Sequence, residues 1–411
     1  MTPSSLMDPL VLQEMIDILS QKFKKSLKIK SVAQLSESDR RNSLLRIHLQ
    51  NSEKEIPNSL IFKQTCLEPS ETEKEALGRF VRDWAGLEFL SQVESKELLA
   101  PRFYGGSLKY RFVLLEDLGE HHVSLVDSLT GDDEPQAKAA LHRFMKCLGQ
   151  FHATGYGKTE TYFEILRKLN SDIPSWQEDL KVIFDDPFPK LKSVLKLFGI
   201  SPSERLWAEI NIVLKASLEP GPFTTFVHGD NCPDNVFDDP EKNELLLIDF
   251  EWGSVRSALL DGSYLRMSMP TCWCSKAIPE DLINSLEATY RTELIKQIPA
   301  AKDDETYQTA YTQACAFWML TIFVEVEKVM DEDRLYNSGP VPEKGLWKPE
   351  ENSGRPRTLS RLQAFINVSK KYDKLPHLKS IATQVLRELK TRWPDAKPLD
   401  LYPAFHQRER Q

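Results

Sequence analysis

The chain has 411 residues, 41% of them hydrophobic and 28% charged, and this composition excludes disordered, collagen-like and disulfide-scaffold proteins. Its 53 basic and 61 acidic residues give a net charge of −8, which argues against a nucleic acid or a membrane surface as partner, because both need a positive face. A chain of this length predicts two or three compact units.

The first part of the chain, residues 1–118, predicts a small lobe rich in strands. Asp8 and Pro9 form an N-cap and first-turn pair, so a helix is expected to follow them. A longer helix is expected over residues 71–93, where apolar side chains recur on one side. Strands are expected at three apolar segments: residues 44–49, 60–63 and 112–115.

The remainder, residues 119–411, is expected to be mainly helical, with a first long helix that closes at Gly155. Residues 314–324 are apolar but shorter than the ~20 residues that span a bilayer, so we interpret them as part of a buried helix. Residues 337–357 are rich in Pro and Gly, and a long segment of this kind predicts either a functional lid or a disordered insertion.

The segment that carries most chemical information is residues 226–237, Phe-Val-His-Gly-Asp-Asn-Cys-Pro-Asp-Asn-Val-Phe. An apolar strand is expected to deliver His228 and Asp230 onto a tight loop, which Gly229 permits and a following proline stiffens. Asn235 follows Asp230 by five residues. A protein kinase catalytic loop has the same five-residue step, in the pattern His-Arg-Asp followed by Asn.

A second hairpin is predicted by residues 236–237 and 244–248, which flank a polar turn. This hairpin is expected to return Asp249 toward Asn235, so that both side chains lie at one site with Asp230. A carboxylate and an amide oxygen suit Mg²⁺, and the remaining carboxylate can orient a hydroxyl group. These are the parts that phosphoryl transfer needs.

With these motifs, residues 30–270 resemble the aminoglycoside phosphotransferase family, kinase-like enzymes that phosphorylate small molecules and include choline kinase-like and homoserine kinase-like branches. The resemblance implies an α+β, bilobal protein-kinase-like fold: a small antiparallel-sheet N-lobe at 1–118 that binds nucleotide, and a large mainly helical C-lobe at 119–411 with a helical C-terminal extension. It implies ATP, or GTP, between the lobes.

The resemblance also implies roles for individual residues. Asp230 is the expected catalytic base, and Asn235 and Asp249 are the expected Mg²⁺ ligands. His228 and Asp261 are expected to support the catalytic loop, because Asp261 resembles the aspartate that braces this loop from the next helix.

In the small lobe, Lys63 is expected to reach two phosphates from the end of its strand. The residue that matches the family's acidic partner in register is Asp83, with Glu88 and Glu75 as alternatives.

The segment 114–118 resembles the hinge, whose backbone at Glu116 and Leu118 is expected to bind adenine. Residues 35–43 contain no glycine, so a phosphate-covering turn there would depend on hydroxyl groups such as Ser38 and Ser43.

The six cysteines are scattered and no secretory leader precedes them, so we expect free thiols in a cytoplasmic protein. Cys272 and Cys274 form a Cys-x-Cys pair, and Cys232 lies within the catalytic segment. A structural zinc site needs four ligands. Since only three thiols are candidates, we interpret them as buried or pocket-lining thiols.

The sequence thus predicts an ATP-dependent small-molecule kinase that phosphorylates a hydroxyl group of an amino sugar, an amino alcohol or a related metabolite, with substrate contacts from residues 252–411. A protein kinase is disfavoured, because the chain lacks a glycine-rich loop and an Ala-Pro-Glu segment and has Glu251 where protein kinases have the glycine of Asp-Phe-Gly. Two further alternatives stay open. One is a choline or ethanolamine kinase, suggested by Ile-Asp-Phe-Glu-Trp at 248–252. The other is a catalytically inactive nucleotide-binding scaffold.

Overall fold

The computed structural model describes residues 6–36, 41–50, 55–69, 71–93, 97–170, 172, 187–219, 221–336 and 352–406. The chain divides into two compact units. The first comprises Met1–His122, Lys158–Ile173 and Leu246–Gly253, and the second comprises Val123–Gly157, Pro174–Leu245 and Ser254–Gln411. The two short later segments of the first unit were not part of the lobe that the sequence predicted.

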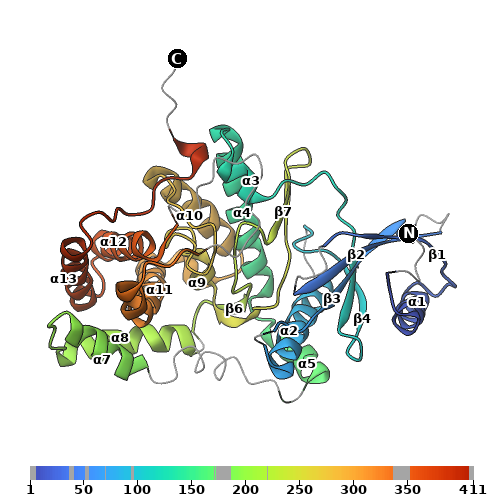
Figure 1. Cartoon of the computed structure of the whole chain (residues 1–411), viewed down its shortest axis with the longest axis horizontal. Coiled ribbons are helices and arrows are strands. Elements are labelled where there is room, and N and C mark those ends of the chain that lie inside the picture. The colour runs from blue at the N-terminus through green and yellow to red at the C-terminus, as the bar shows by residue number, and fades with distance from the viewer. Residues whose placement is uncertain are drawn as a thin grey trace. The chain divides into compact units, whose positions relative to one another are not determined.

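The first unit contains a five-stranded antiparallel sheet with the strand order β1-β2-β3-β5-β4 (Figure 1). Its strands are β1 (Ile29–Gln34), β2 (Asn42–Leu49), β3 (Ser59–Thr65), β4 (Phe103–Ser107) and β5 (Phe112–Glu116). The three strands predicted from apolar segments are therefore confirmed. The sequence did not predict β4, because two of its five residues are glycines, which are rare in strands.

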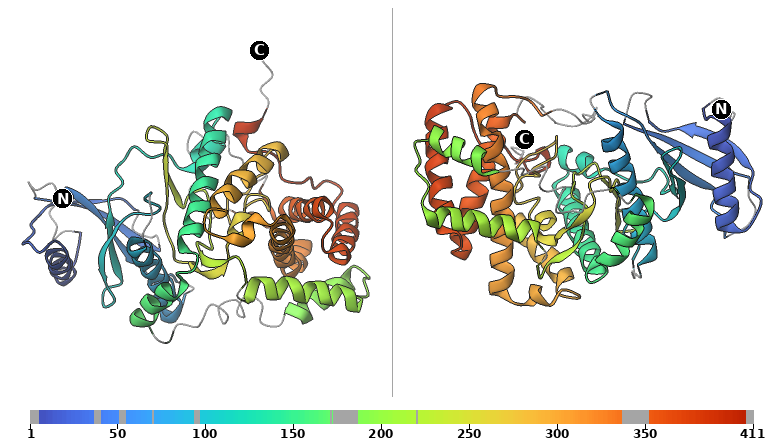
Figure 2. Two further views of the ribbon diagram at one scale, coloured as in Figure 1. Left: turned by 180° about the vertical axis from the view of Figure 1, so that it is seen from behind. Right: turned by 90° about the horizontal axis from the view of Figure 1, so that it is seen from below.

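Two helices cover opposite faces of this sheet: α1 (Pro9–Phe23) and α2 (Glu73–Gln92). Successive strand residues point to opposite faces. A Cβ atom on Gly105 would lie 2.5 Å from Ile18 of α1, and one on Gly106 would lie 2.8 Å from Trp84 of α2. The two glycines of β4 therefore let both helices approach the sheet edge closely, on either side (Figure 2).

Both helices begin at capping residues that their sequences supply. The side chain of Asp8 accepts a hydrogen bond from the Leu10 amide, as the N-cap prediction requires. Thr72 and Glu75 form a capping box at the start of α2, which confirms the helix predicted there. A third helix, α5 (Thr159–Leu169), packs beside α2 in the same unit.

The second unit is mainly helical (Figure 1). Its α-helices are α3 (Leu125–Thr130), α4 (Glu134–Gly155), α7 (Pro187–Leu197), α8 (Glu204–Leu218), α9 (Ala258–Gly262), α10 (Glu280–Leu294), α11 (Asp304–Asp331), α12 (Gly354–Tyr372) and α13 (Pro376–Arg392). It also holds the short helical turns η2 (Pro299–Lys302) and η4 (Pro403–Phe405). Strands β6 (Thr224–Val227) and β9 (Ser254–Ser257) pair antiparallel.

Strands β7 (Val236–Asp239) and β8 (Glu244–Leu247) form the hairpin that the sequence predicts after the catalytic segment. The predicted helix end at Gly155 and the predicted buried helix, which lies within α11, are also confirmed. The α+β class, with an antiparallel sheet in the N-terminal part and a helical remainder, is as predicted. No helix in the described ranges is long and apolar enough to cross a membrane.

Candidate functional site

The loop after β6 makes the tight turn that the sequence predicts. Gly229 has a φ of 79°, a left-handed conformation that glycine adopts at little cost. The backbone amides of His228 and Gly229 both donate to one carboxylate oxygen of Asp261, over 2.8 Å and 3.4 Å. Asp261 on α9 therefore holds the loop through two backbone hydrogen bonds, at the position where the family resemblance predicts a bracing aspartate.

Asp261 is itself fixed by a buried histidine. His152 on α4 is fully buried, with Nε2 3.3 Å from Asp261 and Nδ1 2.7 Å from the Tyr290 hydroxyl. Burial alone would raise the pKa of Asp261, but its contacts with His152 outweigh burial and lower the pKa below the ordinary value. The loop is thus anchored on the buried carboxylate of Asp261, which His152 of α4 also contacts.

Replacing Asp261 by asparagine is expected to lower the free energy of unfolding by about 1.5–3 kcal/mol, because a buried charged acceptor of several hydrogen bonds is lost. Since the pKa of Asp261 is lowered in the folded state, its contribution is present at neutral pH and is lost as the pH falls below about 4. Urea unfolding at pH 7 and pH 3 tests both statements, with the exposed Asp395→Asn as control. Equal stability of the two variants at pH 7 would contradict the bracing role.

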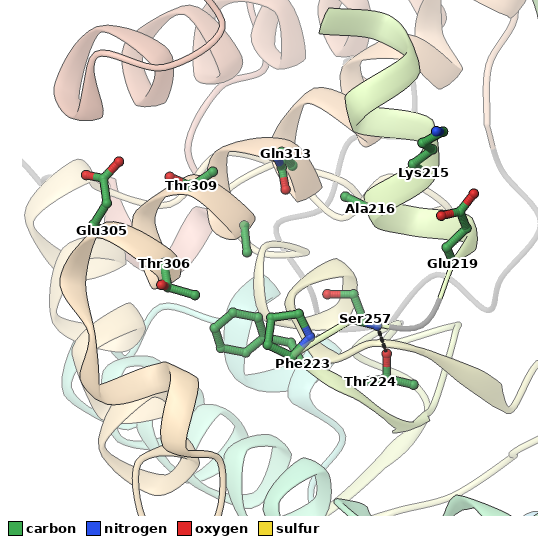
Figure 3. A pocket seen from close by; sticks show the side chains of 13 residues that line it. Lys215, Ala216, Glu219, Phe223, Thr224, Ser257, Glu305, Thr306, Thr309 and Gln313 are labelled. Atoms are coloured by element: carbon green, nitrogen blue, oxygen red, sulfur yellow. Dashed lines mark hydrogen bonds between the residues drawn. The ribbon is translucent and has the colours of Figure 1, made fainter.

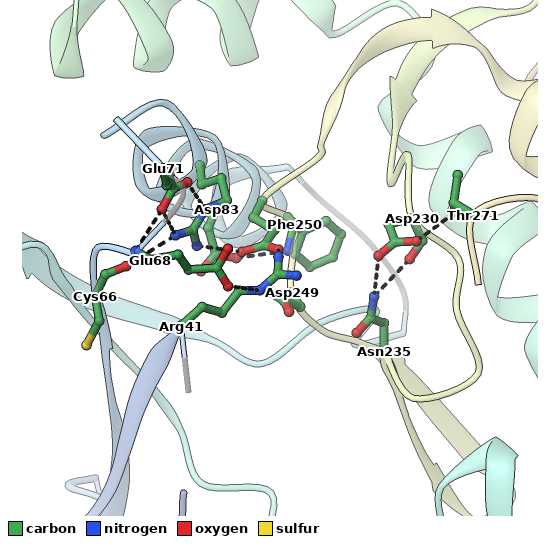
Figure 4. Close-up of polar contacts among 12 residues, drawn as sticks. Arg41, Cys66, Glu68, Glu71, Asp83, Asp230, Asn235, Asp249, Phe250 and Thr271 are labelled. Atoms are coloured by element: carbon green, nitrogen blue, oxygen red, sulfur yellow. Dashed lines mark hydrogen bonds and ion pairs between the residues drawn. The ribbon is translucent and has the colours of Figure 1, made fainter. Parts of the chain in front are cut away.

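Asp230 is held in one orientation by two neighbours (Figure 4). The Thr271 hydroxyl donates to Oδ1 over 2.9 Å, and Asn235 Nδ2 donates to Oδ2 over 3.2 Å and to the Asp230 backbone carbonyl over 3.0 Å. Thr271 also shares a 2.7 Å hydrogen bond with the Tyr264 hydroxyl. Sequence reasoning identified Asp230 and Asn235 but missed Thr271, which no local pattern connects with a residue 41 positions earlier.

Within the first unit, Lys63 on β3 lies between two carboxylates. Its Nζ is 2.8 Å from Asp83 Oδ2 and 2.6 Å from Asp249 Oδ1. The other oxygen of Asp83 accepts from the Phe250 amide over 2.8 Å, so Asp83 ties the strand lysine to the segment that carries Asp249. Neither alternative acid fills this place: Glu75 closes the capping box of α2, and Glu88 accepts from the indole of Trp84.

Burial and neighbouring charges have opposite effects on the pKa values of Lys63 and Asp83 in this cluster. Burial lowers the pKa of Lys63, but the carboxylates of Asp249 and Asp83 outweigh it and raise the pKa above the ordinary value. Burial raises the pKa of Asp83, and the Lys63 ammonium group opposes this rise. The carboxylates therefore stabilise the charged form of Lys63, and Lys63 in turn stabilises the charged form of Asp83.

Glu251 is a further member of this cluster that the sequence did not identify. Its buried carboxylate pairs with Arg41 and, over 3.1 Å, with Arg79 on α2. Arg79 also pairs with Glu71 over 2.6 Å. Glu251 thus fastens the segment that carries Asp249 to α2. The sequence feature that could have indicated a buried acidic partner is Arg79, a charged residue on the apolar side of the predicted helix.

The structure describes some of the remaining residues predicted to contact the nucleotide, and others lie outside the described ranges. Glu116 ends β5, and Leu118 follows it at intermediate exposure, so the hinge prediction falls at a strand end. Ser43 lies within β2, paired with Gln64 of β3, rather than in the turn before it. Ser38 lies outside the described residues, as does most of the predicted lid, residues 337–351.

Asn235 lies in the second unit and Asp249 in the first, and each offers a side-chain oxygen of the kind that Mg²⁺ takes. Mg²⁺ takes hard oxygen ligands, commonly one or two from protein side chains. The hydrogen bonds from Asn235 Nδ2 to Asp230 turn the amide so that its carbonyl oxygen points away from Asp230 (Figure 4). The Asp249 side chain is 27% exposed, and the residue has a φ of 68°, a left-handed conformation uncommon for aspartate.

A separate cavity of about 470 Å³ lies in the second unit, lined by α8, α11 and the start of β6 (Figure 3). Lys215, Glu219, Phe223, Glu305 and Gln313 are among its lining residues. None of the site residues predicted from the sequence lines it. We therefore do not assign the phosphoryl-transfer chemistry to this cavity.

The chain belongs to the phosphotransferase enzyme family, whose pattern it matches over residues 58–275. This stretch contains Lys63, Asp83, Asp230, Asn235 and Asp249. The family confirms the predicted class of enzyme, a phosphotransferase that acts on a hydroxyl group. A search of curated proteins found no match to the chain.

Solved structures similar to this chain include a GDP complex of aminoglycoside 2'-phosphotransferase-IIIa, at 13% identity and a TM-score of 0.41, covering 88% of this chain and 99% of that one. An ethanolamine kinase of Plasmodium vivax has 12% identity and a TM-score of 0.40, with coverages of 92% and 87%. Amicoumacin kinase in complex with AMP-PNP and Ca²⁺ has 12% identity and a TM-score of 0.40, with coverages of 90% and 95%.

Proposed function

We propose that the protein transfers the γ-phosphoryl group of ATP to a hydroxyl group of a small amino-bearing molecule, an amino sugar or an amino alcohol. The observation that carries this proposal is the fixed carboxylate of Asp230, which Thr271 and Asn235 hold from two sides. A carboxylate in a fixed orientation suits the alignment of an attacking hydroxyl group. The net charge of −8 is compatible with a cationic acceptor.

In the proposed reaction, the acceptor oxygen forms a bond to the γ-phosphorus, and the bond between this phosphorus and the oxygen of the leaving ADP breaks. Asp230 orients the acceptor hydroxyl and takes its proton late in the transfer. Lys63 holds phosphate oxygens, and its own position is fixed by Asp83. Asn235 and Asp249 would hold Mg²⁺, which when bound neutralises charge on the phosphate oxygens.

Several features around this core belong to the proposal. The backbone at Glu116 and Leu118 would bind the base of the nucleotide, and GTP is a possible second donor. Ser38 and Ser43 would cover the phosphates. We place the reaction in the cytoplasm, which the six free thiols support because thiols stay reduced there.

A turnover assay tests the function. ADP formation is measured with ATP, and GDP formation with GTP, across a panel of amino sugars, amino alcohols that include choline and ethanolamine, neutral sugars and nucleosides. We expect turnover that requires an amino-bearing acceptor. Turnover restricted to neutral sugars or nucleosides would contradict the acceptor class. Tight nucleotide binding without turnover on any acceptor would support the inactive scaffold instead.

A further inference from the structure

Three buried cysteines of the second unit gather beside the catalytic loop. Cys232 lies in the loop itself, between Asp230 and Asn235, and Cys272 and Cys274 follow Thr271. Their exposed fractions are 5%, 0% and 0%. The sulfur atoms of Cys272 and Cys274 are 3.1 Å apart. Cysteines 40 positions apart in the chain thus meet next to the residue that orients Asp230.

A carboxylate, that of Asp234, also belongs to this cluster. The sulfur atoms of Cys232 and Cys272 and a carboxylate oxygen of Asp234 all lie within 4.8 Å of one another. Zinc bonds measure about 2.3 Å to sulfur and about 2.0–2.2 Å to oxygen, so the ligand atoms of one tetrahedral ion lie about 3.6–3.8 Å apart. The three atoms are therefore close to the spacing that a single ion would impose.

An orphaned oxygen of Asp234 points to a cation independently. Oδ2 of Asp234 accepts a hydrogen bond from the Trp273 indole over 3.0 Å. Oδ1 is buried and has no hydrogen-bond partner among the described residues. A buried carboxylate oxygen without a donor is costly, and such groups are usually satisfied by a donor or a metal ion. A cation among these ligands would satisfy this atom.

Two buried arginines donate hydrogen bonds to the backbone of the segment that carries Cys272. Arg357 on α12 donates to the carbonyl oxygens of Cys272 and Trp273 over 2.6 Å and 3.0 Å. Arg361, one turn further along, donates to the Pro270 carbonyl over 2.8 Å. Within the described part of the chain, both guanidinium groups have only uncharged oxygens as hydrogen-bond partners. A zinc ion with thiolate and carboxylate ligands carries a net negative charge that would balance them.

We propose that Cys232, Asp234 and Cys272 bind a Zn²⁺ ion, with Cys274 as the fourth ligand. Thiolates select zinc over Mg²⁺, so this site is distinct from the oxygen ligands Asn235 and Asp249. Each thiol that becomes a ligand loses its proton to solvent. The ion links the loop that carries Asp230 to the segment that carries Thr271, and so holds the two partners of the 2.9 Å hydrogen bond together. This inference does not depend on the proposed acceptor.

The metal content of the purified full-length protein tests the site. We expect about one zinc per chain by mass spectrometry of the metals. After replacement of zinc by Co²⁺, we expect the near-ultraviolet absorption of cobalt–thiolate bonds and the visible bands of tetrahedral cobalt. Absence of zinc together with absence of the cobalt–thiolate absorption, in wild-type protein with a folded circular dichroism spectrum, would overturn the proposal.

Variants assign the ligands. Cys232→Ser, Cys272→Ser and Asp234→Asn are each expected to lose the zinc or to bind it at least about tenfold more weakly, and the same is expected for Cys274→Ser. Cys315→Ser is the matched control, because Cys315 is also fully buried but lies on α11, outside the cluster. Equal zinc content in all five variants would overturn the assignment, as would a disulfide between Cys272 and Cys274 in the intact protein, detected as the loss of two hydrogen masses.

Discussion

Replacing Asp230 by asparagine is expected to lower kcat for acceptor phosphorylation by at least about a hundredfold, because a positioned general base contributes about 10²–10⁴-fold. Asparagine has nearly the same shape, and its single amide oxygen can still accept from either Thr271 or Asn235, while Asn235 keeps its hydrogen bond to the backbone carbonyl of residue 230. The variant therefore removes the basic oxygen and leaves the loop in place. Steady-state kinetics with the acceptor found in the panel measures this loss.

The binding of nucleotide separates the proposed role from a folding defect. Asp230→Asn is expected to bind ATP as tightly as the wild type in calorimetric titrations, because the proposed nucleotide contacts come from other residues. Asp239→Asn is the matched control, since this aspartate in β7 pairs with exposed Lys242 near the hairpin turn. Undiminished kcat in Asp230→Asn would overturn the base assignment even if the substrate class were correct.

Features set by neighbours in the chain could be predicted from the sequence. Asp8 and Pro9 start α1 because an N-cap needs only the amides that follow it. The loop at Gly229 follows from the residue type that adopts its positive φ at the least cost. The five-residue step from Asp230 to Asn235 brings the two side chains to 3.2 Å, since the loop between them is short.

Features that depend on distant contacts could not be predicted in the same way. Glu251 and Arg79 are separated by 172 positions, and their pairing requires the fold to bring α2 beside the segment after β8. The meeting of Cys232 with Cys272 likewise depends on how α9 returns the chain. The sequence contains these residues, but their spacing has no period that a local rule recognises. The choice of Asp83 over Glu75 and Glu88 was possible only through the resemblance to a family.

Replacing Lys63 by methionine is expected to have the largest effect on stability, a loss of about 3–5 kcal/mol in the free energy of unfolding, because it leaves buried carboxylates without their cation. Asp83 is 3% exposed, and Lys63 is the ammonium group 2.8 Å from it. Catalysis should fall as well, because the variant lacks the proposed phosphate contact. The kcat/KM for ATP is expected to drop by about a hundredfold, which corresponds to about 2.7 kcal/mol.

The pH dependence of this loss identifies its cause. Burial already raises the pKa of Asp83 in the native protein, and the Lys63 ammonium group limits that rise. Without the ammonium group the folded-state pKa rises further above that of the unfolded chain. Stability then falls as the pH increases through this interval, because the folded state binds more protons than the unfolded one. The deficit of Lys63→Met is thus expected to be smaller at pH 5 than at pH 8 in urea unfolding.

Lys74→Met, which replaces an exposed lysine on α2, is the control and should leave stability nearly unchanged at both pH values. A deficit that does not vary with pH would show that lost packing, and not the unpaired carboxylate, accounts for it.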